Sequence, residues 1–290
     1  MSAPAAADRE LAGQAAVVTG AGAGIGQGIA LRLAHAGADV TILEIDPERG
    51  ERTAELVRAE GVRALVVPTD VMQVEQVQRG IEAGQAEFGR TDILVNNAGG
   101  VRARPFLEQK EANWRRLIDI NLVSALAATS TAVPFMIAGG RGGAVLNVVS
   151  IEASRAAPDF AVYAACKAAL VNLTRTFALE FAEHDVRVNA VAPDITVTPG
   201  IRGQISGPVD PSSWPVRDPE DQAAFERYIP LGREGVVEEI ADVAVFLCSP
   251  GARYVTGTLV PVDGGTWASA GWTRNPSGKG WTLIGREHRT

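Results

Sequence analysis

Hydrophobic side chains occur along the chain in seven short runs rich in β-branched residues, and longer stretches with helical spacing separate these runs. The runs are continuous rather than alternating, which is typical of strands covered on both faces. Strands that alternate with helices predict a parallel sheet with right-handed crossovers. We therefore expect an α/β fold, a single doubly wound Rossmann-type domain with a seven-stranded parallel sheet and helices on both faces. The predicted strands are residues 15–18, 40–43, 64–67, 93–95, 144–149, 186–191 and 259–262.

Two stretches interrupt this alternation. Residues 199–230 contain several prolines that exclude a long helix, and an excursion of this length in a compact domain is usually functional. We interpret it as a substrate lid with Trp214 as an apolar wall; a solvated surface insertion is the alternative. Residues 266–290 form an irregular tail with three tryptophans, which suggests docking against a neighbouring subunit. The expected organisation is a frayed N-terminus (1–10), one catalytic domain (11–265) and this C-terminal tail.

Composition limits the classes of partner. The chain has 290 residues, 46% of them hydrophobic and 21% charged, as expected for a soluble globular protein. The 34 acidic residues outnumber the 27 basic ones, which argues against binding nucleic acid or an anionic membrane surface. No apolar run approaches 18 residues, so no membrane span is expected. We predict a small-molecule substrate.

Cysteine and histidine are sparse. Cys166 and Cys248 are too few for a disulfide framework, which indicates a reducing compartment and a cytoplasmic location. The three histidines are scattered along the sequence, and neither they nor the cysteines have a metal-binding spacing. We therefore expect no metal site.

A glycine-rich turn joins the first predicted strand to a predicted helix over residues 27–36. In Thr19-Gly20-x-x-x-Gly24-Ile25-Gly26, the glycines allow the backbone to approach a pyrophosphate, whose charge the helix N-terminus stabilises. Glu44 ends the second strand, where an acidic residue binds ribose hydroxyls and repels a 2'-phosphate. With no Lys or Arg beside it, the sequence favours NAD over NADP; a solvated strand-end acid is the alternative.

Tyr163 and Lys167 are four positions apart, so on a helix their side chains lie on one face. An ammonium about 4 Å from the phenol, at an effective dielectric of about 20, would lower the tyrosine pKa by about three units. Desolvation opposes this shift. An exposed surface pair is the alternative.

Several short motifs occur in one order, and through them residues 12–265 resemble the short-chain dehydrogenase/reductase superfamily. The motifs are the glycine turn, Asp70-Val71, Asn96-Asn97-Ala98-Gly99, Asn121, Ser150, Tyr163-x-x-x-Lys167 and Val262-Asp263-Gly264-Gly265. The resemblance implies that Tyr163 is the general acid/base and that Lys167 lowers its pKa and holds the nicotinamide ribose. It also implies that Ser150 polarises the substrate oxygen and that Asn121 anchors a water that relays the proton.

The resemblance also implies cofactor and substrate contacts. Asp70 and Val71 would bind the adenine, and Thr198, or else Thr196, the carboxamide. The contacts implied around the glycine turn and the adenosine are Gly20, Gly24, Ile25, Gly26, Glu44, Asn97, Ala98 and Gly99. Substrate contacts are expected from Ser150, Tyr163, Glu152 and Trp214, although Glu152 is read equally well as a solvated loop acid.

The sequence departs from the family at Pro193-Asp194, where the family usually has Pro-Gly. Aspartate tolerates left-handed backbone angles, so the turn can survive this change. A carboxylate facing the cleft would disfavour an anionic substrate end.

We therefore expect an NAD-dependent dehydrogenase that interconverts a secondary alcohol and a ketone, with a partly apolar substrate of small to medium size. One alternative is an NADPH-dependent carbonyl or 3-oxoacyl reductase on the same fold. Another is a nucleotide-sensing protein without turnover, since fold does not fix function. The family resemblance implies a homotetramer, assembled through the helices after Asn97 and around Tyr163 and through an edge strand near Leu259.

Overall fold

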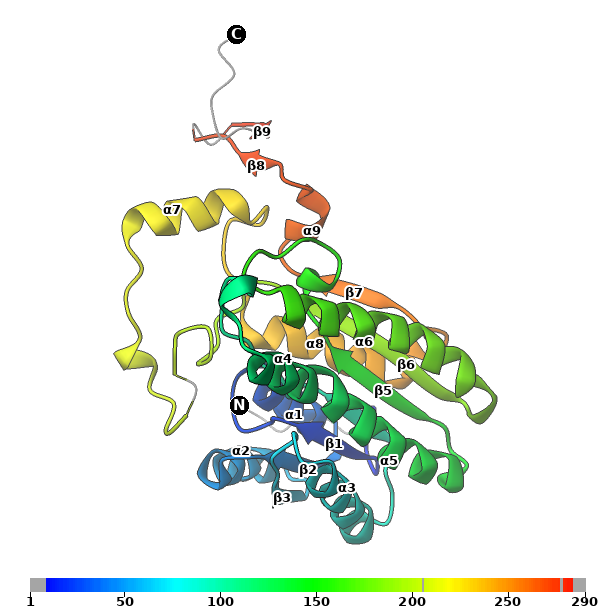
Figure 1. Cartoon of the computed structure of the whole chain (residues 1–290). Helices are drawn as coiled ribbons and strands as arrows, with labels where there is room; N and C mark the ends of the chain where they lie inside the picture. The colour runs from blue at the N-terminus through cyan, green and yellow to red at the C-terminus, as the bar shows by residue number, and fades with distance from the viewer. Residues whose placement is uncertain (1–8, 205, 277–278, 284–290) are drawn as a thin grey trace.

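The computed structural model describes residues 9–204, 206–276 and 279–283. Within them, seven parallel strands form the main sheet in the order β3-β2-β1-β4-β5-β6-β7 (Figure 1). Each predicted strand is present within two residues of its expected bounds, so the predicted fold class is confirmed. The strands are β1 (Ala15–Thr19), β2 (Asp39–Glu44), β3 (Ala64–Pro68), β4 (Ile93–Asn96), β5 (Gly143–Val148), β6 (Val186–Pro193) and β7 (Leu259–Val262).

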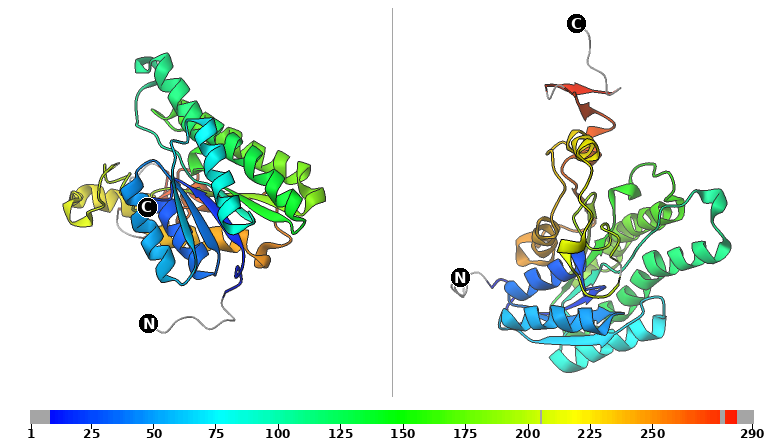
Figure 2. Two further views of the ribbon diagram at one scale, coloured as in Figure 1. Left: turned by 90° about the horizontal axis from the view of Figure 1, so that it is seen from below. Right: turned by 90° about the vertical axis from the view of Figure 1, so that its left-hand side faces the viewer.

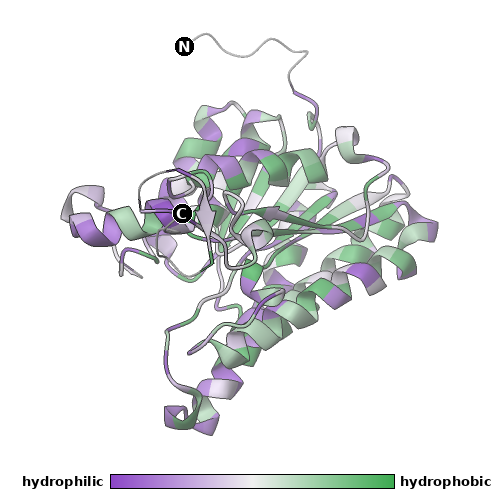
Figure 3. Cartoon of the chain, turned by 90° about the horizontal axis from the view of Figure 1, so that it is seen from above, coloured by the Kyte–Doolittle hydropathy of each residue, from purple (hydrophilic) through white to green (hydrophobic). Residues whose placement is uncertain are grey.

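Helices cover both faces of this sheet (Figure 2). One face carries α1 (Gly24–His35), α2 (Pro47–Ala59) and α8 (Val237–Cys248), and the other carries α3 (Val74–Phe88), α5 (Ser124–Gly139) and α6 (Ala161–Glu180). Successive strand residues point to opposite faces, so Val17 and Val18 of β1 enter two different hydrophobic cores. Figure 3 shows the resulting concentration of hydrophobic residues between the layers.

The strand order reverses between β1 and β4. From β1 the chain continues to β2 and β3 on one side, and it then returns to place β4 on the other side. In open α/β sheets, ligands bind in the crevice at the carboxyl ends of the strands beside such a reversal. The glycine turn after β1 and the Asn97–Gly99 segment after β4 both lie at this point, which locates the candidate site.

One helical stretch corrects an expectation from the sequence. Residues Glu111–Gly139 form a 29-residue stretch that is long and apolar enough to cross a membrane by length and composition. It comprises α4 (Glu111–Ile118), a π-helical turn (Asp119–Val123) and α5. The expectation that no such apolar stretch exists was therefore wrong. Because α5 buries Ala128, Ala132 and Met136 in the core beneath the sheet, we interpret it as a core helix.

The interruption at 199–230 contains local structure. A short 3₁₀ turn (Pro211–Ser213) is followed by α7 (Pro219–Tyr228), which begins with a proline, where its missing N–H has no helical partner to lose. The Asp218 side chain caps α7 by accepting from Glu220 N. None of the residues of α7 is fully buried, and Figure 1 shows this segment extending from the body of the fold.

The C-terminal tail is more regular than the sequence predicted. It contains α9 (Thr266–Ser269) and a two-stranded antiparallel hairpin of β8 (Thr273–Arg274) and β9 (Trp281–Thr282), and β8 contacts α7. Trp267, Trp272 and Trp281 are 52%, 45% and 42% exposed. Residues 1–8 of the expected frayed N-terminus, and 277–278 and 284–290 of the tail, lie outside the described residues.

Candidate active site

The glycine turn begins the site. Gly20 and Gly24 have φ angles of +63° and +58°, a region that side chains other than glycine rarely adopt. A Cβ at Gly26 would lie 2.2 Å from the Gly20 carbonyl oxygen and 2.4 Å from Asn97 Nδ2. Ile25 faces the hydrophobic core below the turn. The turn therefore exposes backbone at the N-terminus of α1, where an anion is favoured.

Glu44 is 8% exposed and lies against this turn. Its Oε2 accepts from Gly22 N at 2.8 Å, and its Oε1 accepts from Asp46 N at 3.1 Å. The solvated strand-end acid, the alternative considered from the sequence, does not fit this burial. The carboxylate instead lies at the end of β2, hydrogen-bonded to the glycine turn.

Asn97 connects the end of β4 to the same turn. Its Nδ2 donates to the carbonyl oxygens of Thr19 and Gly20 at 2.9 and 3.0 Å, and the backbone N–H groups of Asn97 and Ala98 donate to Thr19 Oγ1 at 3.0 Å. The Asn97 amide thus holds the glycine turn in place. The positioning contribution of Thr19 was not foreseen, because a buried hydroxyl that binds two backbone N–H groups has no sequence signature.

Asp70 and Val71 follow β3. Asp70 Oδ1 accepts from Met72 N at 3.0 Å, and Asp70 N donates to Gln76 Oε1 at 2.9 Å. The Val71 side chain is 8% exposed and belongs to the core on the α3 face. These bonds form a rigid turn at the end of β3, next to the strand that carries Glu44.

Asn121 lies in the π-helical turn between α4 and α5, and it is 1% exposed. Its Nδ2 donates to the carbonyl oxygens of Gly100 and Leu117, and its Oδ1 accepts from Gly100 N at 3.1 Å. A Cβ at Gly99 would lie 2.7 Å from Asn121 Oδ1 and 3.3 Å from Lys167 Nζ. Gly99 therefore lets Asn121 and Lys167 approach each other, and π turns are frequent at functional sites.

Tyr163 and Lys167 project from α6 toward the end of β5. The Lys167 side chain is buried, and its Nζ donates to the Val148 carbonyl oxygen at 3.0 Å. The same nitrogen lies 5.7 Å from the centroid of the Tyr163 ring. Ser150, two residues after the end of β5, is hydrogen-bonded to Tyr163, so three of the four expected catalytic residues meet here. Asn121 lies beside Lys167, across Gly99. An exposed Tyr/Lys surface pair is thereby excluded.

The protonation of this pair differs from the sequence expectation. Burial raises the pKa of Tyr163; the hydrogen bond with Ser150 opposes that rise, and the charge of Glu152 adds to it. Burial also lowers the pKa of Lys167 to about 8, partly offset by Cys166. The expected lowering of the tyrosine pKa is therefore wrong: its pKa is raised, because burial disfavours the charged form of the phenol.

Of the two candidate threonines, Thr198 lies beside the glycine turn. Its Cβ is 3.4 Å from the position that a Cβ on Gly24 would occupy. Thr196 is buried, and its Oγ1 donates to the Asp194 carbonyl oxygen at 3.3 Å. The geometry favours Thr198 as the residue that faces a bound nucleotide.

Glu152 and Trp214 differ in their surroundings. Glu152 is ion-paired with Arg155 at 2.6 Å, so it is not the freely solvated acid considered from the sequence. Trp214 Nε1 donates to Gln204 Oε1 at 3.0 Å, a contact within the 199–230 segment itself. The φ angle of Asp194 is not positive. The turn after Pro193 therefore does not use the left-handed backbone conformation that the sequence suggested.

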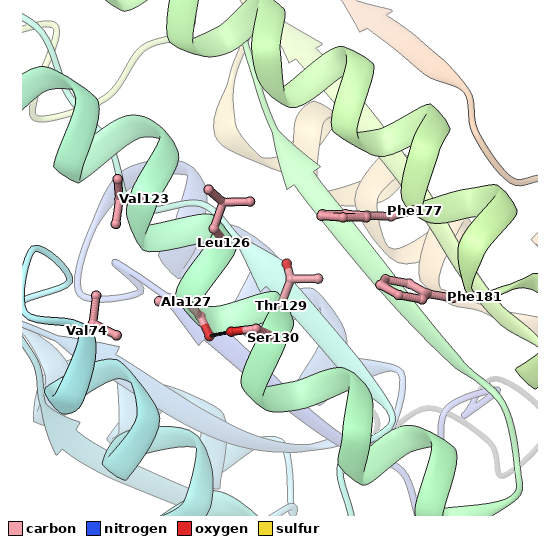
Figure 4. A pocket seen from close by; sticks show the side chains of 8 residues that line it. All are labelled: Val74, Val123, Leu126, Ala127, Thr129, Ser130, Phe177 and Phe181. Carbon is pink, nitrogen blue, oxygen red and sulfur yellow. Dashed lines mark hydrogen bonds between the residues drawn. The ribbon is translucent and has the colours of Figure 1, made fainter.

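A separate apolar pocket lies away from these residues. One side of the pocket is lined by Leu126 and Ser130 of α5 and by Val123 of the preceding π-helical turn (Figure 4). The other side is lined by Phe177 of α6 and by Phe181, which follows α6; the two rings stack with centroids 5.2 Å apart. It opens on the outer helix surface rather than at the carboxyl ends of the strands.

Known proteins are similar to this chain in sequence and in fold. A family model described as enoyl-(acyl carrier protein) reductase matches residues 20–266. The chain is 37% identical to 3beta-hydroxysteroid dehydrogenase 1 of Eggerthella lenta over 257 residues, 88% of this chain and 94% of that protein. It is 35% identical to a 3-oxoacyl-(acyl-carrier-protein) reductase of Thermotoga maritima over 257 residues, 88% of this chain and 98% of that protein.

A solved 7α-hydroxysteroid dehydrogenase complexed with NADH and 7-oxo glycochenodeoxycholic acid has a TM-score of 0.81 and 32% identity to the chain. The match covers 90% of this chain and 98% of that chain. The chain belongs to the short-chain dehydrogenase/reductase superfamily, an oxidoreductase family, as its motifs predicted.

Proposed function

We propose that this protein is an NAD(H)-dependent oxidoreductase that interconverts a secondary alcohol and a ketone. The convergence of Ser150, Tyr163, Lys167 and Asn121 at the carboxyl ends of β4 and β5 carries this proposal. A polar cluster around a phenol, beside a nucleotide-binding turn, suits the transfer of a proton together with a hydride.

Each side chain has a distinct part in this proposal. Tyr163 takes the hydroxyl proton during oxidation and returns it during reduction, while Ser150 donates a hydrogen bond to the substrate oxygen. Lys167 holds its ammonium 5.7 Å from the centre of the Tyr163 ring, and Asn121 orients the backbone at Gly100. The nicotinamide, when bound, accepts or supplies the hydride.

Replacement of Tyr163 tests the acid/base assignment. We expect Tyr163→Phe to lower kcat by about a hundredfold to ten-thousandfold, because general acid–base catalysis contributes roughly 10² to 10⁴ in rate. Nicotinamide affinity should change by less than about threefold, since the ring is retained. Steady-state kinetics and fluorescence titration with NADH measure the two quantities. Turnover within tenfold of the wild type would refute the assignment.

The buried Glu44 carboxylate supports NAD as the cofactor, since it would repel a 2'-phosphate at the end of β2. We expect Glu44→Gln, which keeps an acceptor for Gly22 N, to reduce the preference for NADH over NADPH by about tenfold or more. Titrations with both nucleotides measure the ratio, and Glu48→Gln on the exposed side of α2 is the matched control. An unchanged ratio in Glu44→Gln would argue against the ribose assignment.

The similarity to a 3-oxoacyl-(acyl-carrier-protein) reductase favours a second candidate, an NADPH-dependent carbonyl or 3-oxoacyl reductase. The same titrations separate the two candidates, because tighter binding of NADPH by the wild type would favour this one. Binding of neither nucleotide would favour the alternative of a protein without turnover.

Assembly and location are also part of the proposal. We place a homotetramer contact at the apolar pocket between α5 and α6, since the family resemblance assigns subunit contacts to these helices (Figure 4). Both cysteines are free and buried, which supports a reducing, cytoplasmic environment.

A further inference from the structure

Arg155 lies five residues after Ser150, in the loop that leads to α6, and it binds side chains from three separate segments. Its Nη2 and Nε donate to the two Glu152 oxygens at 2.6 and 3.3 Å. Its Nη1 donates to Tyr228 Oη, at the end of α7, at 2.5 Å. Its Nη2 also lies 3.6 Å from Asp194 Oδ1, just after β6. We name Arg155, Glu152, Asp194 and Tyr228 the Arg155 cluster.

The charges in this cluster do not balance. Two carboxylates share one guanidinium, which leaves one negative charge uncompensated. The second Asp194 oxygen accepts from Thr266 Oγ1 at 2.7 Å, and Asp263 Oδ2 is 3.1 Å from the same hydroxyl, so a third carboxylate lies next to the cluster. The Asp194 side chain is only 10% exposed, so solvent screens its charge less than it would at the surface.

The cluster is directly connected to the reacting groups. Ser150 Oγ accepts from Glu152 N at 3.2 Å, and Ser150 is itself hydrogen-bonded to Tyr163. The Glu152 charge also reaches the phenol, since it adds to the rise in the Tyr163 pKa that burial produces. A substrate oxygen held by Ser150 and Tyr163 therefore places the neighbouring carbons close to this negative charge.

Asp194 gives the cluster its second carboxylate. The family resemblance leads us to expect glycine at this position, which would leave Glu152 and Arg155 as a balanced pair. Since the backbone here does not need a positive φ, glycine is not required by the turn. The aspartate ties Arg155 to Thr266, and it does so at the cost of a second negative charge beside one guanidinium.

We propose that the Arg155 cluster is a charge filter of the active site. Its uncompensated negative charge disfavours substrates with a carboxylate near the reacting carbon and admits neutral or cationic secondary alcohols and ketones. This inference rests on the proposed oxidoreductase function and narrows its substrate class. A like charge about 8 Å away, at an effective dielectric of about 20, disfavours binding by at least about tenfold.

Matched pairs of a 3-oxo methyl ester and the corresponding 3-oxo acid, in several chain lengths, test the filter. The kcat/KM of each is measured with the preferred reduced nicotinamide at pH 7.5, and for pairs without turnover the Kd is measured with the enzyme–NADH complex. We expect the wild type to prefer the ester by at least tenfold. Asp194→Asn should lower this ester-to-acid ratio by about tenfold, and added salt should lower the wild-type ratio.

Two further variants keep the test decisive. Asp194→Gly restores the family residue and should give the same change in ratio if Asp194→Asn fails to fold. Asp242→Asn removes an equal charge from an exposed pair with Arg32 on the outer side of α8, and it should leave the ratio unchanged.

An ester-to-acid ratio near one in the wild type would overturn the filter. So would an unchanged ratio in folded Asp194→Asn and Asp194→Gly, because the cluster would then be only a structural tie. Failure of the wild type to bind either nicotinamide would instead overturn the proposed function, which separates the two inferences.

Discussion

Lys167 brings an ammonium into the interior with only 4% of the residue exposed and one hydrogen bond, to the Val148 carbonyl oxygen. Burial lowers its pKa from 10.5 to about 8. Below pH 8 the folded protein must therefore hold a charge that burial disfavours, which costs stability. A residue with this cost and with contacts to Tyr163 is a reasonable functional candidate.

This burial predicts a pH-dependent effect of removing the lysine. The folded pKa lies below the unfolded value, so the unfolded state binds more protons between about pH 8 and 10.5, and stability rises with pH through this window. We expect Lys167→Met to be more stable than the wild type by about 1 to 3 kcal/mol at pH 7, less the cost of the unpaired Val148 carbonyl. The difference should shrink toward pH 10.5.

Urea unfolding at pH 7 and pH 9.5 measures this difference, and Lys279→Met, at an exposed position in the tail, is the control. A Lys167→Met variant that is less stable than the wild type at both values would contradict the prediction.

At the scale of elements, α1 and α8 pack in close contact at Gly28. A Cβ at this position would lie 2.1 Å from Val237 Cγ1, at the start of α8. The short distance places the N-terminus of α1, and with it the glycine turn, directly against α8. The position of the glycine turn thus depends on a helix contact outside the turn itself.

We expect Gly28→Ala to lower the free energy of unfolding by about 1 to 3 kcal/mol, because overpacking outweighs the gain of roughly 1 kcal/mol in helix propensity. Val237→Ala in the same chain should restore most of that loss by removing the methyl group that clashes. A double-mutant cycle by urea unfolding measures this coupling. Independent, additive effects of the two substitutions would show that the contact does not limit the packing.

For the whole molecule, an apolar pocket opens between α5 and α6, next to the core that Ala127 and Phe177 help to form (Figure 4). Leu126 is 37% exposed there. An exposed apolar patch on a helix layer is typical of a subunit contact. The proposed homotetramer would bury this patch.

We expect Leu126→Glu to dissociate the tetramer into smaller species, because the subunit contact would bury an unpaired carboxylate. Sedimentation velocity or mass photometry measures the oligomer, and Leu56→Glu on the exposed side of α2, at 44% exposure, is the control. An unchanged tetramer in Leu126→Glu would remove α5 from the interface, and a monomeric wild type would refute the proposed assembly.

The sequence by itself determined where the strands lie along the chain and which family the chain belongs to. Continuous β-branched runs define strands, and the motifs from Thr19 to Gly265 identify the family, because each motif is read within a few neighbouring residues. Helix geometry likewise places Tyr163 and Lys167 on one face without any tertiary information. Boundaries were predicted within two residues for the strands because turn residues mark them.

Only the tertiary structure decided the electrostatics and the long-range contacts. The burial of Lys167, the bonds of Thr19 and Asn97 to the glycine turn, and the meeting of Arg155 with Asp194 and Tyr228 join residues far apart in sequence. A pKa depends on desolvation, which requires the surrounding packing, so the predicted lowering of the Tyr163 pKa became a rise. Proximity along a helix is local information, whereas burial belongs to the whole fold.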